Sequence, residues 1–233
     1  MIKKQYKHIF FDLDHTLWDF EKNSAEALQE LYIRHQLAER GGFMADAFVQ
    51  TFHEVNEHLW SLYSIGKLDS EHIRNKRFGM IFHRLGAKIS AVPETLAEEY
   101  LQLCPTKPHV LPYTFEILDY LKSRYVLHVV TNGFDDVQAI KMNSAGLTGY
   151  FVEIITSGRS GYKKPHRKIF DFAVELTRAN REDCIMIGDN LEADIAGAKN
   201  AGLDHIFFNY KGLQHNEEVA YEINCLSQLR SIL

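Results

Sequence analysis

The stretch IFFDLDHTL, residues 9–17, decides the fold that this sequence predicts. The apolar run at residues 6–13 has the length and composition of a buried β-strand, and two acidic residues, Asp12 and Asp14, stand at its end. Side chains two positions apart in an extended strand point to the same side, so these two carboxylates would repel each other. The strand end is therefore predicted to need a compensating positive charge.

Four later apolar runs also have the character of buried strands, and helix-period segments lie between them. The predicted strands are residues 126–131, 152–156, 184–187 and 205–208. The predicted helices are residues 135–145, 167–178 and 191–201, the last of which is followed by Gly202 as a C-cap. Alternating strands and helices predict an α/β fold with a Rossmann-like, doubly wound parallel sheet that helices cover on both faces.

The alternation breaks once, between the first and second predicted strands. This interval carries amphipathic helical patterns at residues 24–35, 46–63, 70–85 and 94–103. Ser70 is the predicted N-cap of the third of these helices, and Pro105, Pro108 and Pro112 mark the return to the sheet. We predict an α-helical bundle domain at residues 20–106, inserted into an α/β domain made of residues 1–19 and 107–233.

The composition is that of a globular chain and argues against several classes of protein. Of 233 residues, 45% are hydrophobic and 24% are charged, close to globular averages. The net charge of −5 and the scattered basic residues argue against binding to a nucleic-acid polymer. We find neither the pattern of a signal peptide nor an apolar run long enough to span a membrane. Three widely spaced cysteines predict reduced thiols in a cytoplasmic protein. We expect this protein to be a monomer or a small homo-oligomer.

Further polar residues follow the predicted strands at the points where those strands end. Thr131 and Asn132 follow the second strand, and Asp189 and Asp194 follow the fourth. In an open parallel sheet, ligands bind outside the carboxyl ends of the strands, where the strand order reverses. The sequence therefore predicts that separate segments contribute to one crevice.

The acidic residues of this crevice favour a metal site. Carboxylate oxygens suit Mg²⁺, which commonly takes one or two carboxylates together with water and substrate phosphate. An alternative for Asp12 and Asp14 is a turn at a strand end, and an alternative for Asp189 is an N-cap of the following helix. A calcium loop fits less well because its D-x-D-x-D-G spacing is missing.

Thr131 and Asn132 lie where a strand gives way to a helix, so their polar groups can bind phosphate oxygens at the helix N-terminus. Lys164, which precedes the predicted helix at residues 167–178, can add positive charge to the same phosphate or neutralise the acids. The alternatives are an ordinary turn and a solvated surface lysine.

Four segments together resemble the ordered motifs of the haloacid dehalogenase superfamily. They are DLDHT at 12–16, TNG at 131–133, KKP at 163–165 and GDNLEAD at 188–194. The helical insertion after the first motif resembles the first cap type of that superfamily. The resemblance implies a magnesium-dependent phosphatase that hydrolyses small-molecule phosphate monoesters.

The resemblance also implies a role for each motif residue. Asp12 would be the nucleophile that forms an aspartyl-phosphate, and Asp14 would protonate the leaving alcohol and then activate water. Mg²⁺ would lie between Asp12, Asp189 and the backbone carbonyl of Asp14. Of the remaining motif residues, Thr131 and Asn132 would position the phosphoryl group, Lys164 would stabilise its charge, and Asp194 would orient the metal waters or Lys164.

Several alternative functions remain open at this stage. Dehalogenases of the superfamily lack an acid at the position of Asp14, so this residue favours phosphoryl transfer. Sugar-phosphate phosphatases and phosphomutases would keep the same core motifs. A different class, a non-catalytic phosphate-binding module on the same fold, is also compatible because fold does not determine function.

The predicted insertion carries weaker indications of the substrate. The stretch LWSLYSIGKL at 59–68, together with Trp18-Asp19-Phe20, is similar to the branch of the superfamily that hydrolyses pyrimidine nucleoside monophosphates. Trp18 and Tyr63 would stack on a base and Arg77 would reach the substrate, which predicts a nucleoside 5′-monophosphate. The alternatives are aromatic core packing for Trp18 and Tyr63, and an ion pair within the bundle for Arg77.

Overall fold

The computed structural model describes residues 5–233, which divide into two compact units. One unit is formed by the chain up to Asp19 together with His109–Leu233, and the other is Phe20–Pro108. The second unit thus ends at Pro108 rather than at residue 106. The prediction about a signal peptide falls partly on residues 1–4, which lie outside the described residues. None of the helices described is both long and apolar enough to cross a membrane.

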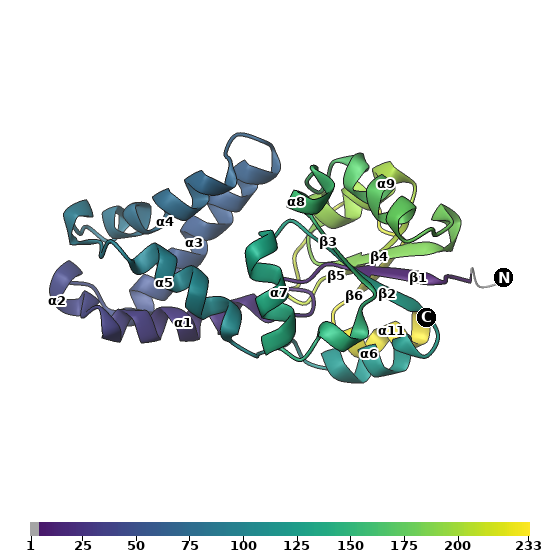
Figure 1. Cartoon of the computed structure of the whole chain (residues 1–233), viewed down its shortest axis with the longest axis horizontal. Helices are drawn as coiled ribbons and strands as arrows, with labels where there is room; N and C mark the ends of the chain where they lie inside the picture. Colours follow the sequence, from purple (N-terminus) through teal and green to yellow (C-terminus); the bar gives the residue numbers. More distant parts are fainter. Residues whose placement is uncertain (1–4) are drawn as a thin grey trace. The chain divides into compact units, whose positions relative to one another are not determined.

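The first unit contains a six-stranded sheet in which every neighbouring pair of strands is parallel (Figure 1). The order is β3-β2-β1-β4-β5-β6. The strands are β1 (His8–Phe11), β2 (Val126–Thr131), β3 (Glu153–Thr156), β4 (Cys184–Gly188), β5 (Asp204–Phe208) and β6 (Tyr221–Ile223). The order reverses at β1, which lies between β2 and β4, so the predicted doubly wound parallel sheet is confirmed.

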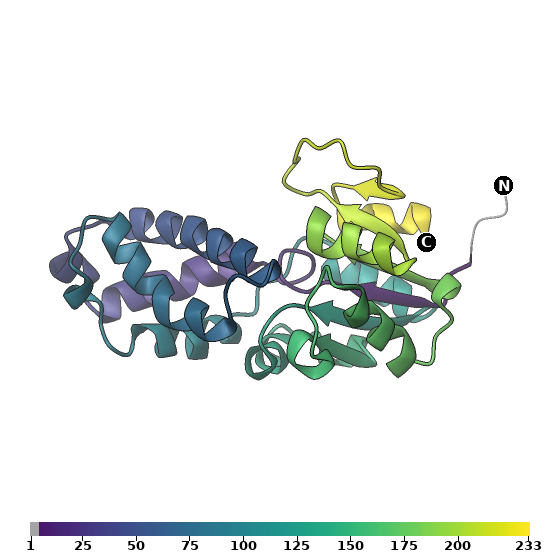
Figure 2. The same ribbon diagram turned by 90° about the horizontal axis from the view of Figure 1, so that it is seen from above.

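Helices pack on both faces of this sheet (Figures 1 and 2). They are α6 (Thr114–Lys122), α7 (Asp135–Ser144), α8 (Ser157–Ser160), α9 (Arg167–Leu176), α10 (Gly197–Ala201) and α11 (Leu229–Ile232). On one face, Phe10 and Met186 of the central strands form a buried cluster with Phe170 of α9 and Ala198 of α10. The strands are apolar on both sides because both faces are covered.

Some boundaries differ from the predicted ones. β1 ends at Phe11, so Asp12 and Asp14 lie in the connection beyond the strand. The segment predicted as one helix at 191–201 is a π-helical turn, Leu191–Ala196, followed by α10. The short strand β6 and helix α6 were not predicted.

The second unit is a bundle of helices, and its interior is rich in aromatic residues. Its helices are α1 (Phe20–Arg34), α2 (Leu37–Gly41), α3 (Ala45–Ser64), α4 (Ser70–Arg84) and α5 (Leu96–Leu103). Phe48 and Phe52 lie four positions apart on α3 and pack with Phe78 of α4. The predicted N-cap at Ser70 is wrong: Asp69 is the cap, because its Oδ1 accepts a hydrogen bond from the His72 N–H at 2.8 Å.

Candidate active site

The candidate site lies at the carboxyl ends of β1, β2 and β4, where the strand order reverses. Its centre is the ammonium group of Lys164, whose side chain is 3% exposed. The Nζ atom donates to Asp12 Oδ1 at 2.5 Å, to Asp194 Oδ1 at 2.6 Å and to the Val130 carbonyl at 2.8 Å. A buried lysine with three oxygen acceptors, two of them from carboxylates, is a compensated charge.

The electrostatics of this cluster are dominated by burial. Burial alone would lower the pKa of Lys164, but Asp12 and Asp194 raise it above the ordinary value, so the lysine stays protonated. Burial raises the pKa of Asp12 to about 7, against the effect of Lys164 and with a further contribution from Asp194. Burial and the neighbouring Asp12 and Asp194 likewise raise the pKa of Asp189 well above its ordinary value.

Three carboxylates of the site fit a divalent cation. Asp12, Asp189 and Asp194 each offer an oxygen atom, and these atoms all lie within 4.8 Å of one another. Burial, with a smaller contribution from neighbouring carboxylates, raises the pKa of Asp12 and of Asp189, and a hard cation bound to their oxygens would favour the ionised forms. The donor set therefore suits Mg²⁺.

Asp194 is fixed more firmly than the other two acids. One of its oxygens accepts from Lys164, and the other accepts from the Asn190 N–H at 3.0 Å. This contact depends on Gly188, because a Cβ at that position would lie 2.2 Å from Asp194 Oδ2. Asp189 is bonded differently, with Oδ1 accepting from the Thr16 hydroxyl at 3.1 Å. Asp12 and Asp189 are thus better placed as metal ligands, and Asp194 as the support of Lys164.

Asn132 holds the main chain of Lys164 at two points. Its Nδ2 donates to the Lys164 carbonyl at 2.9 Å, and its Oδ1 accepts from the Lys164 N–H at 2.8 Å. These two bonds fix the orientation of the Asn132 amide, and its Nδ2 keeps a second hydrogen that can be donated to a phosphate oxygen. The Thr131 hydroxyl is buried and accepts from the Gly133 N–H at 3.0 Å.

Asp14 does not join the Lys164 cluster but has a lysine of its own. The Nζ of Lys141, on α7, lies 2.6 Å from Asp14 Oδ1 and 2.9 Å from Oδ2. Lys141 was not among the site residues predicted from the sequence. The available signal was its position, because Val137, Gln138, Lys141 and Met142 form the buried face of α7, where a lysine requires a partner.

His15, between the two acids, has a left-handed backbone with a φ of 64°. Few residues other than glycine and asparagine adopt this conformation without cost. The His15 Nδ1 lies 3.1 Å from the Tyr210 hydroxyl, which follows β5. The motif loop is therefore tied to a second loop of the same unit.

The three predicted substrate-specificity residues all lie in packed interiors. Trp18 is fully buried in the first unit, where Lys141 Nζ lies 4.4 Å from the centre of its ring. Tyr63 is buried and packs edge-on against Trp60. Arg77 is 3% exposed, and its Nη1 donates to Asn56 Oδ1 at 2.8 Å. Burial favours the packing alternative for Trp18 and Tyr63, and their contact with substrate stays a prediction.

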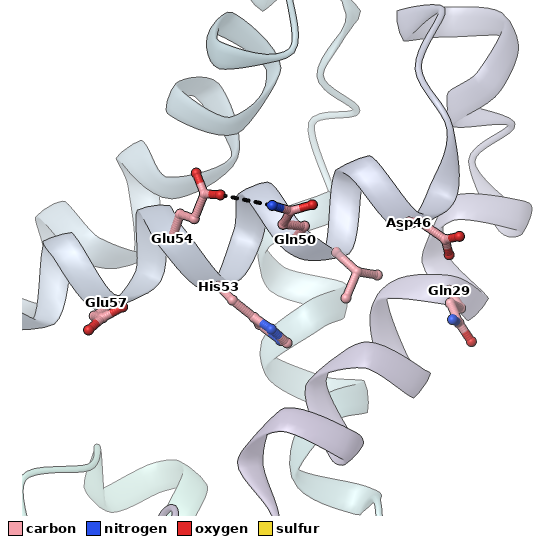
Figure 3. A pocket seen from close by; sticks show the side chains of 7 residues that line it. Gln29, Asp46, Gln50, His53, Glu54 and Glu57 are labelled. Carbon is pink, nitrogen blue, oxygen red and sulfur yellow. Dashed lines mark hydrogen bonds between the residues drawn. The ribbon is translucent and has the colours of Figure 1, made fainter. Parts of the chain in front are cut away.

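The helical unit has a pocket of its own, with a volume of about 530 Å³ (Figure 3). It is lined by Gln29 of α1 and by Asp46, Val49, Gln50, His53, Glu54 and Glu57 of α3. None of the predicted site residues lines it, and its three carboxylates would repel a phosphate. His53 also contacts Glu21 and the Ser24 hydroxyl in a Ser-His-Glu arrangement, but Ser24 is fully buried and cannot attack a substrate.

The buried acids and the buried lysine lie at the switch point of a parallel sheet, which is where open α/β sheets bind their ligands. Residues 6–202 match the model of the haloacid dehalogenase-like hydrolase family. The chain belongs to this family, as the motif resemblance predicted.

Relatives of known or assigned activity match nearly the whole chain. Pyrimidine 5′-nucleotidase YjjG of Escherichia coli is 30% identical, with 97% of this chain and 96% of that protein covered. Pyrimidine 5′-nucleotidase PynA of Streptococcus pneumoniae is also 30% identical, with 98% and 95% covered. Glyceraldehyde 3-phosphate phosphatase of Pyrococcus furiosus reaches the same 30% identity, with 99% and 94% covered.

A similar solved structure is that of the HAD-hydrolase YfnB from Bacillus subtilis bound to magnesium. Its TM-score is 0.87 at 27% identity, and the match covers 98% of this chain and 99% of that chain. The similarity therefore extends over both the α/β unit and the helical unit.

Proposed function

We propose that this protein is a magnesium-dependent phosphatase that hydrolyses small-molecule phosphate monoesters, with nucleoside 5′-monophosphates as its substrates. The observation that carries the proposal is the pairing of each acid of the first motif with a separate lysine. Asp12 is bonded to Lys164 beside Asp189 and Asp194, and Asp14 is bonded to Lys141. Two carboxylates in different surroundings can take different chemical roles.

In this proposal, Asp12 and Asp189 hold Mg²⁺ together with the Asp14 backbone carbonyl. When bound, the cation supplies positive charge that offsets the carboxylates and the phosphoryl oxygens. Lys164 stabilises the charge of the phosphoryl group, and Asp194 and Asn132 hold Lys164 in place from its side chain and its main chain. Thr131 contributes a further contact to the phosphoryl oxygens.

The reaction proceeds in two displacements. An Asp12 carboxylate oxygen attacks phosphorus, and the ester P–O bond breaks with its electron pair on the leaving oxygen, which takes the proton of the Asp14 carboxyl group. Asp14, now ionised, takes a proton from water as that water attacks phosphorus. The bond between phosphorus and Asp12 breaks, and inorganic phosphate leaves. Because a dehalogenase needs no acid for a leaving alcohol, Asp14 favours this chemistry.

Two pyrimidine 5′-nucleotidases at 30% identity over nearly the full chain support the choice of nucleotides. The equal identity of a glyceraldehyde 3-phosphate phosphatase supports a second candidate, a sugar-phosphate phosphatase. As part of the proposal, the helical unit acts as the cap that selects between these substrates. We also propose a cytoplasmic monomer or small homo-oligomer that acts without a nucleic-acid or membrane partner.

The experiment that tests the proposal is a phosphate-release screen with and without Mg²⁺. Its panel contains pyrimidine and purine nucleoside 5′-monophosphates, triose and hexose phosphates, and p-nitrophenyl phosphate. We expect Mg²⁺-dependent release that is fastest with the pyrimidine nucleotides, and its loss in Asp12→Asn. Faster release from sugar phosphates would transfer the proposal to the second candidate. No release from any ester, or full activity of Asp12→Asn, would refute it and favour a non-catalytic module.

A further inference from the structure

Lys141 is a buried cation that forms an ion pair with Asp14, the second acid of the first motif. It is 6% exposed, and its Nζ lies within 2.9 Å of both oxygens of Asp14. The same Nζ lies 4.4 Å from the centre of the Trp18 ring. A lysine in the buried face of a helix loses its hydration, which costs several kcal/mol unless a partner compensates it. The main partner that the fold supplies is the second acid of the motif.

The backbone on which Asp14 stands is fixed independently of Lys141. The His15 N–H donates to the Trp18 carbonyl at 3.0 Å, and the Trp18 N–H donates to the Leu13 carbonyl at 2.9 Å. Trp18 itself is fully buried. What these bonds leave undetermined is the orientation of the Asp14 side chain, and this is what the two contacts with Lys141 fix.

Asp14 nevertheless stays open to a ligand. Its side chain is 23% exposed, whereas the Asp12 side chain is 11% exposed and the Lys164 side chain 3%. An ammonium group carries three hydrogens, enough for both oxygens of a carboxylate. If one oxygen of Asp14 carries a proton, the other oxygen can keep its bond to Lys141. The same contact can therefore hold Asp14 before and after a proton transfer.

We propose that Lys141 is a positioning residue that holds the Asp14 carboxyl group in line with the leaving oxygen and, in the second displacement, with the attacking water. The inference rests on the proposed function, because it assigns Lys141 to the proton transfers of that reaction. Lys141 contacts Asp14 and needs no contact with the substrate. It links α7, which follows the TNG motif, to the proton-transfer step of the first motif.

The test compares Lys141→Met, Lys141→Arg and Asp14→Asn with two esters in the presence of Mg²⁺. One is p-nitrophenyl phosphate, whose leaving group departs without a proton, and the other is the best alkyl ester of the screen. The measured quantity is the rate of alcohol release in the first turnover. We expect Lys141→Met to lose about 10- to 100-fold with the alkyl ester, less than the full contribution of a general acid because Asp14 itself remains. With the p-nitrophenyl ester we expect a loss of about threefold or less, and Lys141→Arg should recover most of the alkyl activity.

A double-mutant cycle separates positioning from a general structural effect. In the Asp14→Asn background, Lys141→Met should lower the alkyl rate by only about twofold, because its effect passes through Asp14. Lys122→Met is the matched control: it removes an exposed ion pair with Asp119 in the same unit and should leave both rates unchanged. If Lys141→Met does not fold, Lys141→Gln replaces it.

Equal losses with the two esters, or an undiminished loss in the Asp14→Asn background, would overturn the inference while the proposed function stands. Activity of Lys141→Met that equals the wild type with both esters would do the same. Failure of the wild-type protein to release phosphate, or full activity of Asp12→Asn, would instead refute the proposed function, and the inference with it.

Discussion

Lys164 and Arg77 are buried cations of different units, and their charges are compensated in different ways. Lys164 of the α/β unit meets two carboxylates and a carbonyl, and the pKa of its ammonium group is raised. Arg77 of the helical unit meets the Asn56 amide, and its guanidinium lies 5.1 Å from the Phe52 ring centre and 4.8 Å from that of Tyr100. Burial lowers the pKa of Arg77.

The difference shows what the surroundings of each of these two cations can do. At the sheet edge, carboxylates and a lysine ammonium group already lie together. A bound cation can take the place of the ammonium beside the carboxylates, and a bound phosphate can take the place of a carboxylate beside the ammonium. Aromatic rings attract a cation without contributing a negative charge. They therefore stabilise a packed interior and provide no ligand for a metal ion. Among residues 5–233, no carboxylate forms an ion pair with Arg77. The alternative of an ion pair for Arg77 is therefore wrong, and its burial favours packing.

The largest expected effect follows from replacing Lys164. Lys164→Met should lower the free energy of unfolding by about 3–5 kcal/mol, because it leaves buried carboxylates without their partner. It should also lower kcat by about 1000-fold through lost charge stabilisation. Urea denaturation in EDTA measures the first effect and steady-state kinetics with Mg²⁺ the second. A variant that unfolds like the wild type would contradict the view of Lys164 as the central compensating charge.

The second largest expected effect is that of Mg²⁺ on the stability of the protein, and it should depend on the acids of the α/β unit. Saturating Mg²⁺ should stabilise the wild-type protein by about 2–3 kcal/mol at 100 times its Kd, because it binds the folded state. Calorimetry or thermal scanning before and after EDTA measures the shift. Asp189→Asn should abolish the shift, and Arg77→Met should retain it in full. An equal shift in Asp189→Asn would place the cation elsewhere.

A buried histidine, His128, sharpens the comparison through the pH dependence of stability. Burial and the neighbouring His8 lower the pKa of His128 to about 4, with Glu153 acting in the opposite direction. The unfolded chain takes up a proton near pH 6.5 and the folded one does not, so stability should fall as the pH drops from about 6.5 toward 4. His128→Gln should remove on the order of 1–2 kcal/mol of this loss, measured by denaturation at pH 7 and pH 5.

The control for this prediction is His58→Gln, which changes an exposed histidine of α3. It should leave the pH dependence as it is in the wild type. A pH dependence that His128→Gln does not reduce would assign the acid sensitivity to other groups.

The smallest effect should come from the second cation. Arg77→Met replaces a guanidinium that has no buried carboxylate to leave behind, so the free energy of unfolding should change by about 1 kcal/mol or less. Urea denaturation measures it beside Lys164→Met. A loss as large as that of Lys164→Met would show that the two buried cations are equivalent, and the comparison would fail.

The sequence was informative where one local pattern determined the structure. Buried parallel strands are short apolar runs, so β2 was predicted with its observed bounds and β1 as a longer run. Tyr221–Ile223 has only three residues, two of them exposed, and carries no such pattern. The motif acids were identifiable because they follow strands at a shared sheet edge, although their roles stay predictions.

Contacts between residues far apart in the chain could not be predicted from the sequence. Lys141 is 127 positions from Asp14, and on its own it resembles any lysine of an amphipathic helix. Asn132 was predicted to contact phosphate because it follows the end of a strand. Only the fold shows that its amide is bonded to the main chain of Lys164. Arg77 was predicted to reach the substrate, with an ion pair in the bundle as the alternative, because a periodic pattern does not reveal a cation stacked on aromatic rings.

The central position of β1 has a consequence for the order in which the protein can fold. His8 pairs in register with Val126 of β2 and with Cys184 of β4, so both neighbours of β1 are synthesised long after it. The helical unit, Phe20–Pro108, is complete before either neighbour exists, and its contacts are local by comparison. During translation, β1, which directly precedes Asp12, therefore has no neighbouring strand to pair with while the bundle can already fold. In a chain that ends before residue 126, the folded bundle should resist proteolysis while β1 is still cleaved.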